Sequence, residues 1–267
     1  MSQAKLVIFA GADRVLRHTR AAGLFGKAAK VLGALQEADV PIVLWSGKTR
    51  AELEQIQHEL GINHPFVCER DGAVFIPVRY FDFVIPRARE VAGHLAVEFG
   101  MPYNDIVAAL HHTARRLAID VVGFNDMSVD DVAAACDLPL PQARLAMLRE
   151  YGEHFRVLGP CDDARPRLFK ALAGAGLRCE SGTPYDYVGA PVRDGTGVKF
   201  LSSLYQRAHG PLLRLGLSDT PADGSILPFV DRRVLLEPDV HVNRRPDVVS
   251  WAEAIVENAE TFVRRAH

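Results

Sequence analysis

Short apolar runs alternate with amphipathic stretches over the first 80 residues. The sequence predicts buried strands at residues 6–9, 41–45, 66–68 and 73–77. Helices are expected at about residues 26–38, which carry apolar side chains on one face, and at residues 49–60. The second helix opens with a capping box, because Glu52 follows Thr49 at the required spacing. Strands that alternate with helices in this way are typical of a parallel sheet covered by helices.

The pattern changes between about residues 81 and 190. Longer helices are expected at residues 86–99, 104–117, 128–136 and 141–153, with short apolar pieces at 156–158 and 185–188 for a small sheet. A helix at 197–208 and apolar runs at 212–217 and 233–236 then resume the first pattern. We therefore predict an α/β protein with a core domain of residues 1–80 and 191–267, and an inserted α+β domain of residues 81–190.

Charge and hydropathy exclude several classes of partner. The 267 residues carry 31 Lys and Arg against 33 Asp and Glu, which gives a formal charge of -2 and no general attraction to nucleic acid or to an anionic bilayer. No apolar run approaches the roughly 18 residues that cross a membrane, and the first residues do not resemble a signal peptide. The four cysteines show no zinc or disulfide spacing. We expect a cytoplasmic protein with a small-molecule ligand.

Ligands of open parallel sheets collect at the carboxyl ends of the strands, so the strand-end loops are the candidate sites. One of these loops, at residues 218–223, places Asp219 and Asp223 four residues apart after an apolar run. Carboxylates in such a loop suit Mg²⁺, although two alone would hold it only weakly. A solvated turn with an aspartate at a helix N-cap fits the same residues.

Two further segments could hold an anion. Ser46, Gly47, Lys48 and Arg50 stand at the start of the second helix, where hydroxyls, backbone N–H groups and cations favour phosphate or carboxylate. An ordinary capping box with surface charges would give the same sequence. Arg149 and Glu150, near the end of an expected helix, form either a ligand clamp or a favourable arrangement of helix charges.

Several segments together resemble the haloacid dehalogenase (HAD) superfamily, its type IIB cap group and, within it, the mannosyl-3-phosphoglycerate phosphatases. These segments are SGKTRAE at 46–52, ERDGAVFIP at 69–77, residues 123–155, GLSDTPADGSILPFVD at 216–231 and SWAEAI at 250–255. The resemblance implies a parallel-sheet core with an inserted type IIB cap. It also implies a magnesium-dependent phosphatase that acts on a phosphorylated sugar or glycerate derivative.

Members of this family carry Asp-x-Asp at the end of the first strand: the first carboxylate attacks phosphorus and the second transfers protons. Here those positions are Ala10 and Ala12, and Asp13 lies one residue further on. The family's phosphate-holding Lys is replaced by Asp194, with Arg193 and Lys199 nearby. The resemblance also implies that Ser46 grips phosphate and that Asp219 and Asp223 bind metal. The turn before Ala73 has Arg70 and Asp71 where the family usually shows Asn-Gly.

Three hypotheses follow. The first is a pseudophosphatase that binds a phosphorylated sugar or sugar-acid metabolite and acts as a sensor, as a partner of another enzyme or as a homo-oligomer. The second is a repurposed enzyme in which Asp13, Asp194, Asp219 and Asp223 converge and carry out metal-independent acid/base chemistry on a sugar-derived substrate. The third is a residual sugar-phosphate phosphatase in which Asp13 or Asp194 activates water.

Overall fold

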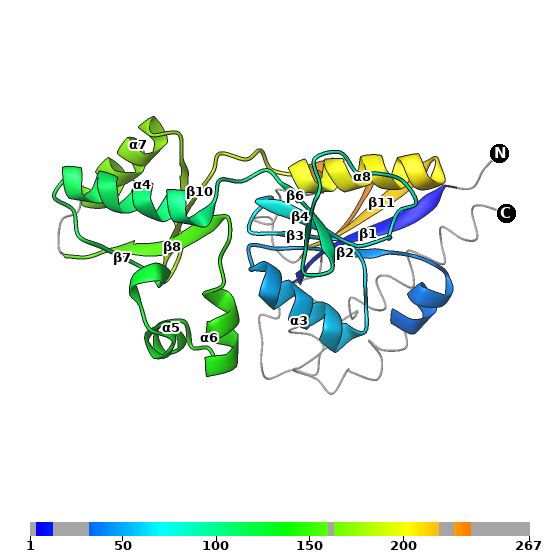
Figure 1. The fold of residues 1–267 in the computed structure, drawn as a ribbon, viewed down its shortest axis with the longest axis horizontal. Coiled ribbons are helices and arrows are strands. Elements are labelled where there is room, and N and C mark those ends of the chain that lie inside the picture. Colours follow the sequence, from blue (N-terminus) through cyan, green and yellow to red (C-terminus); the bar gives the residue numbers. More distant parts are fainter. Residues whose placement is uncertain (1–3, 13–31, 160–162, 219–226, 236–267) are drawn as a thin grey trace.

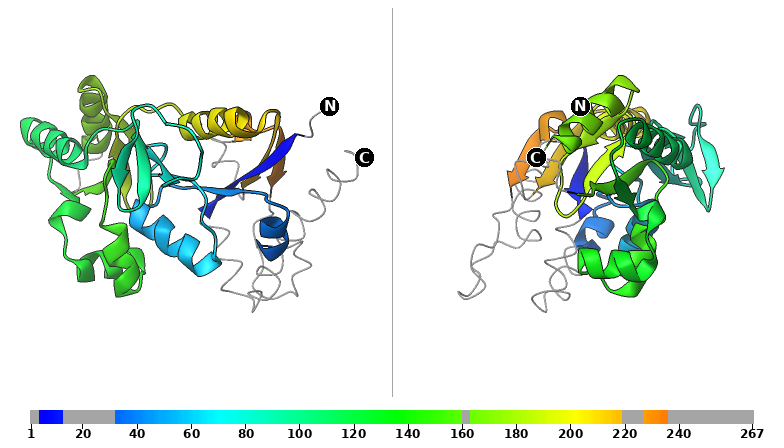
Figure 2. Two further views of the ribbon diagram at one scale, coloured as in Figure 1. Left: turned by 45° about the vertical axis from the view of Figure 1, so that its right-hand side comes forward. Right: turned by 90° about the vertical axis from the view of Figure 1, so that its left-hand side faces the viewer.

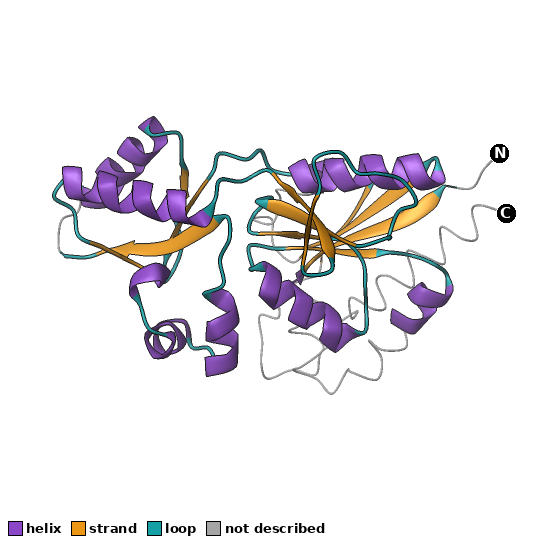
Figure 3. Ribbon diagram, in the orientation of Figure 1, coloured by secondary structure: helices purple, strands orange, loops and turns teal. Residues whose placement is uncertain are grey.

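A computed structural model of the chain describes residues 4–12, 32–159, 163–218 and 227–235. Within these residues the strands form two sheets, one of eight strands and one of four. Figure 1 shows the larger sheet and its helices on one side and the smaller sheet and its helices on the other. We call the first unit the core and the second the cap. Figure 3 shows that each unit combines strands with helices, as the sequence predicts.

The larger sheet runs in the order β12-β11-β1-β2-β3-β4-β6-β5. Its strands are β1 (Lys5–Gly11), β2 (Ile42–Trp45), β3 (Phe66–Cys68), β4 (Ala73–Pro77), β5 (Arg89–Val91), β6 (His94–Glu98), β11 (Leu212–Ser218) and β12 (Arg232–Leu235). The pairs from β12 to β3 are parallel, whereas β3, β4, β6 and β5 pair antiparallel. The predicted parallel core is therefore confirmed, and every strand expected in it is present.

Helices cover both faces of this sheet. Helix α8 (Thr196–His209) lies above it and α3 (Arg50–Leu60) lies below, on the same side as the helical residues 32–37 (Figure 1). Along β1, Val7 and Phe9 pack in the cluster with α8, while Ile8 and Ala10 pack in the cluster with α3. A strand that is buried on both faces reads as a continuous apolar run, which is why the sequence identified it.

The cap has an antiparallel sheet in the order β7-β8-β10-β9. Its elements are α4 (Tyr103–Arg116), β7 (Val121–Gly123), α5 (Val129–Cys136), α6 (Leu140–Ala146), β8 (Gly152–Val157), α7 (Ala164–Gly174), β9 (Arg178–Glu180) and β10 (Asp186–Gly189), with 3₁₀ turns at Phe124–Asp126 and, in the core, at Leu227–Phe229. Helices α4 and α7 pack on the sheet, and α6 faces α3 of the core (Figure 2).

Two predictions of secondary structure are wrong. The helix expected at residues 86–99 is the hairpin of β5 and β6, joined by Ala92 and Gly93, which both have positive φ, as a tight hairpin turn requires. Its strands pair onto β4, so the chain leaves the larger sheet after Glu98, later than the predicted boundary at residue 81. The helix expected at 141–153 ends at Ala146, because the following residues turn into β8.

No helix among the described residues is long and apolar enough to span a bilayer.

Candidate functional site

The carboxyl end of β1 carries only small apolar side chains. Ala10 lies beside Leu44 of β2 and Leu217 of β11, in the middle of the parallel part of the sheet. Ala10 and Ala12 both have 0% of their surface exposed and belong to the apolar cluster under the sheet. A buried methyl group has no lone pair to attack phosphorus or to coordinate a metal. As far as the structure describes this strand end, to Ala12, it therefore presents neither a nucleophile nor a metal ligand.

The segment after β2 forms the predicted capping box. Thr49 accepts the N–H of Glu52 at 3.2 Å and Glu52 accepts the N–H of Thr49 at 2.9 Å. The Ser46 hydroxyl accepts the Lys48 N–H at 3.2 Å, and the Lys48 ammonium lies 3.4 Å from the Glu52 carboxylate. The Thr49 hydroxyl also donates to the Leu145 carbonyl of the cap at 2.8 Å. Residues 46–52 thus close the N-terminus of α3, and Thr49 also binds the core to the cap unit.

Asp71 occupies the N-terminus of α8. Its carboxylate accepts the N–H of Gly197 at 2.7 Å, the N–H of Gly195 at 3.1 Å and the indole N–H of Trp45 at 3.3 Å. Burial raises the pKa of Asp71, while these three donors oppose the rise. The Asp71 carboxylate therefore occupies the N-terminus of α8, close in sequence to Arg193 and Lys199, the cations that the sequence analysis suggested for binding an anion.

The three candidates at the start of α8, Arg193 and Asp194 before the helix and Lys199 in its first turns, contact other partners. The Asp194 carboxylate forms an ion pair of 2.7 Å with Arg178 of the cap strand β9. Lys199 is exposed, and its ammonium lies over the ring of Phe229, 4.2 Å from the centroid. Arg193 is exposed, and its carbonyl accepts the hydroxyl of Thr196 at 2.6 Å.

Glu69 joins the core to the cap. Its side chain has no exposed surface and accepts the N–H groups of Glu150 at 2.8 Å and Tyr151 at 3.0 Å. It also pairs with the Arg149 guanidinium at 3.1 Å. Burial raises the pKa of the Glu69 carboxyl, and the charge of Arg149 opposes the rise. Arg50 adds a second link between the two units, an ion pair of 2.7 Å with Glu150.

Three consecutive residues of the turn between β3 and β4 have left-handed backbones, with φ of 46° at Glu69, 57° at Arg70 and 65° at Asp71. Left-handed backbone at non-glycine residues is unfavourable and persists where surrounding contacts fix it. Here the three side chains make different contacts, since Glu69 reaches the cap, Arg70 reaches the pocket and Asp71 caps α8. The sequence indicated only a turn, although the acidic residues before Gly72 were a usable signal.

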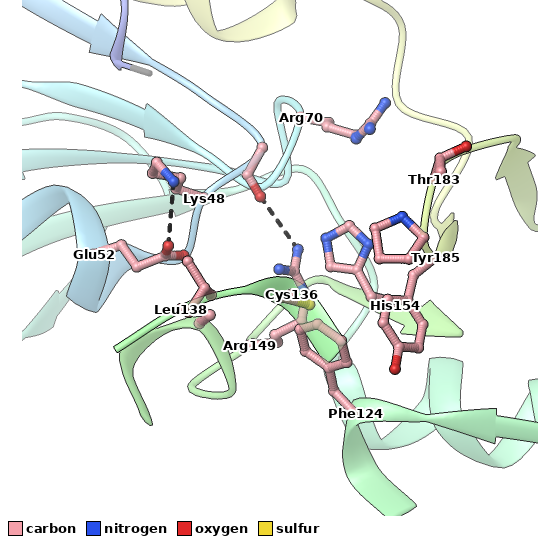
Figure 4. A pocket seen from close by; sticks show the side chains of 13 residues that line it. Lys48, Glu52, Arg70, Phe124, Cys136, Leu138, Arg149, His154, Thr183 and Tyr185 are labelled. Carbon is pink, nitrogen blue, oxygen red and sulfur yellow. Dashed lines mark hydrogen bonds and ion pairs between the residues drawn. The ribbon is translucent and has the colours of Figure 1, made fainter. Parts of the chain in front are cut away.

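A pocket of about 270 Å³ lies between the core and the cap. Figure 4 shows Lys48, Glu52 and Arg70 entering it from the core, and Arg149, His154 and Tyr185 from the cap. Its other lining residues are Gly47, Phe124, Cys136, Leu138, Ala146, Thr183 and Pro184. A second hollow of about 430 Å³, between α3 and α6, shares Lys48, Glu52 and Leu138 with it. The two hollows are neighbours along the core–cap boundary.

His154 of the cap lines the pocket in its neutral form. Burial, together with the charges of Arg149 and Arg70, holds the pKa of His154 well below its usual range, so the imidazole is neutral at pH 7. Tyr187 packs beside it, and the Arg70 guanidinium lies over the Tyr187 ring, 4.7 Å from the centroid. Arg70 also pairs with the Glu180 carboxylate. His154 carries no signal in the sequence, because only the folded cap brings it to the pocket.

The structure brings together part of the predicted site. Gly47, Lys48 and Arg149 line the pocket, whereas Arg50 and Glu150 pair with each other across the core–cap boundary and do not line it. Ser46 is buried next to Lys48, whereas Asp194, Arg193 and Lys199 do not line this pocket. Asp13, Asp219 and Asp223 lie outside the described residues, so their convergence stays a prediction. Among the described residues no group of three or more His, Cys, Asp or Glu could hold a metal ion, and Ala10 and Ala12 do not fit Mg²⁺.

The sequence is 31% identical over 216 residues to the glucosyl-3-phosphoglycerate/mannosyl-3-phosphoglycerate phosphatase of Methanococcoides burtonii, a match that covers 80% of this chain and 79% of the relative. The chain belongs to the mannosyl-3-phosphoglycerate phosphatase family. A second phosphatase of this kind, from Persephonella marina, is 29% identical over 85% of this chain and 82% of its own length. These matches confirm the resemblance inferred from residues 46–52, 69–77 and 123–155.

Solved structures place this family member in the HAD fold. A haloacid dehalogenase-like hydrolase from Bacteroides thetaiotaomicron superposes with a TM-score of 0.61 at 14% identity, over 96% of this chain and all of the other. A HAD subclass IIB sugar phosphatase superposes with a TM-score of 0.55 at 10% identity, over 96% and 99% of the two chains. At these identities the likeness shows the fold alone. No protein-family model matches the sequence.

Proposed function

We propose that this protein is a pseudophosphatase: it binds a phosphorylated sugar or sugar-acid metabolite and does not hydrolyse it. The observation that carries the proposal is the burial of Ala10 and Ala12 at the carboxyl end of β1. Aspartyl-phosphate chemistry needs a carboxylate to attack phosphorus and a second to move the proton. Methyl groups in an apolar cluster do neither.

The absence of the two carboxylates at the end of β1 is expected to lower the rate of hydrolysis greatly. Residues that act as a unit in catalysis are not additive, and removal of the nucleophile alone typically lowers the rate by several powers of ten. Two carboxylates that the structure describes nearby have other partners, since Asp194 pairs with Arg178 and Asp71 caps α8. Similarity of fold does not restore an activity whose site residues have changed.

The residues that line the pocket support the binding of a small metabolite. The pocket between core and cap is lined by the cations Lys48, Arg70 and Arg149 and by the rings of Phe124 and Tyr185. Pockets that combine apolar surface with a few polar groups are the usual sites for small molecules. The relatives are phosphatases of glycosyl phosphoglycerates, so a metabolite of that class is the first ligand to test. A protein with this pocket and no turnover would serve as a sensor or as a regulatory partner of an enzyme.

Phosphate release from mannosyl-3-phosphoglycerate, with and without Mg²⁺, tests the proposal. We expect no release by the native chain and calorimetric binding of this compound or of its sugar-acid part. A variant that carries Ala10→Asp, Ala12→Asp and Asp194→Lys is the matched comparison, and activity there would show that the rest of the site is intact. Turnover by the native chain that is lost in Asp194→Ala would overturn the proposal, as would absence of binding to every glycosylated glycerate.

A further inference from the structure

The charges that line the pocket are paired. Lys48 lies 3.4 Å from Glu52, Arg149 lies 3.1 Å from Glu69, and Arg70 pairs with Glu180. Among the described residues, each of the three cations that line the pocket therefore pairs with a carboxylate; Glu52 also lines the pocket, whereas Glu69 and Glu180 lie outside its lining. A pocket built to hold a dianion normally offers an excess of positive charge, as Arg clusters do for phosphate.

Two more carboxylates, those of Asp194 and Asp71, lie at the start of α8. Arg178 lies 3.1 Å from Glu180 and 2.7 Å from Asp194, so Asp194 extends the ionic chain that begins at Arg70. Asp71 adds another carboxylate, at the first turn of α8. A phosphate monoester carries between one and two negative charges at pH 7. To bind at Arg70 or Arg149 it would have to compete with the carboxylate that already pairs with that arginine.

The uncharged surfaces of the pocket suit a sugar ring. Phe124 and Tyr185 pack edge to face, with centroids 5.1 Å apart, and both line the pocket. Their apolar faces can cover the C–H side of a pyranose, while paired Lys, Arg and Glu side chains supply both donors and acceptors for hydroxyl groups. Neutral His154 adds one acceptor, because its N–H is engaged by the Asp186 backbone. A volume of about 270 Å³ is close to the lower limit for ligand pockets, which favours a ligand of about one sugar and one small acid.

From this charge balance we propose that the pocket selects an unphosphorylated glycosyl carboxylate, a sugar linked to a small hydroxy acid, over the phosphate ester of the same compound. The inference rests on the proposed function and narrows its ligand. One carboxylate carries a single charge and meets the arginine fork in a planar geometry, so it disturbs the existing pairs less than a phosphate does. The class of reaction that supplies such a ligand is hydrolysis of the phosphate ester.

Calorimetry with three ligands tests this proposal: mannosyl-3-phosphoglycerate, its dephosphorylated form and inorganic phosphate. We expect the dephosphorylated form to bind at least about tenfold more tightly than the ester, and inorganic phosphate not to compete. Equal or tighter binding of the ester would overturn this inference and leave the proposed function standing. If neither glycoside binds, both proposals fail.

Substitution of the carboxylate partners tests the charge argument. Glu180→Gln keeps the shape of the side chain and gives the pocket one uncompensated positive charge. We expect affinity for the ester to rise by about tenfold while affinity for the dephosphorylated form changes by less than about threefold. Glu52→Gln is a second variant, on the opposite wall, with the same expectation. Glu90→Gln, exposed on β5, is the matched control and should leave both affinities unchanged. An unchanged preference in both pocket variants would contradict the proposal.

Discussion

Glu69 of the core and Arg149 of the cap form an ion pair that is buried on both sides, with 0% and 2% of the side chains exposed and 3.1 Å between Oε2 and Nη2. The same carboxylate accepts two backbone N–H groups of the cap. The pair is thus the centre of the joint between the two units. Removal of one member of a buried pair leaves the other charge without compensation, which costs more than the pair itself contributes.

Glu69→Ala should lower the free energy of unfolding by about 3–5 kcal/mol, because Arg149 keeps its charge inside the joint and two N–H groups lose their acceptor. Urea denaturation followed by circular dichroism measures the change. Glu90→Ala on the exposed strand β5 is the control and should change stability by less than about 0.5 kcal/mol. A loss below about 1 kcal/mol for Glu69→Ala would show that the joint is open in solution.

Stability should depend on pH through His154. Its folded pKa lies well below the usual value of about 6.5, so below pH 6.5 the unfolded chain binds a proton that the folded chain does not. The contribution of this group is therefore present above pH 6.5 and is lost as the pH falls. At pH 5.5 the loss is about 1 kcal/mol relative to pH 7.5.

His154→Gln removes the pH dependence of stability that is due to this imidazole. The difference between the stability curves of the native protein and the variant separates the effect of His154 from that of the buried carboxylates. Urea denaturation at pH 7.5, 6.5 and 5.5 gives both curves. We expect the native protein to lose about 1 kcal/mol more than the variant over this range. Parallel curves would mean that the imidazole has the same pKa in the folded and in the unfolded protein.

Gly197 on α8 has no room for a side chain. A Cβ there would lie 2.7 Å from Val67 Cγ1 and 2.9 Å from Asp71 Oδ1. Gly197→Ala should therefore shift the Asp71 cap and destabilise the protein by about 1–3 kcal/mol. Gly174, at the end of α7, has open space around the same atom and serves as the control. There alanine should be neutral or stabilise by a few tenths of a kcal/mol. Thermal unfolding of the two variants checks the contrast, and equal melting temperatures would refute the close packing.

Restoring the missing carboxylate should have a stability cost. Ala10 is fully buried in an apolar cluster, so Ala10→Asp places a carboxylate without a partner among apolar groups. We expect a loss of about 2–4 kcal/mol in the absence of metal. Ala34→Asp, exposed in the helical residues 32–37, is the control. An Ala10→Asp variant as stable as the control would show that the strand end still accommodates the charge, and would weaken the case for a lost reaction.

Sequence alone determined much of the core. The runs at β1, β2 and β3 are apolar on both faces, and Thr49 and Glu52 meet the local rule for a capping box, so both features follow from neighbouring residues. The alanines at positions 10 and 12 were also readable, because they require only the end of a strand, and the resemblance to the family motif predicts carboxylates there.

Tertiary structure decided the rest. The hairpin of β5 and β6 exists because β4 offers an edge that completes its hydrogen bonds, and residues 86–99 taken alone do not reveal that edge. Glu69 and Arg149 are 80 positions apart in the chain, as the numbering shows, and only the docking of the cap makes them a buried pair. The charge balance of the pocket depends on four separate segments. A sequence lists which charged groups are present, but their partners depend on distance in space, and distance is set by packing.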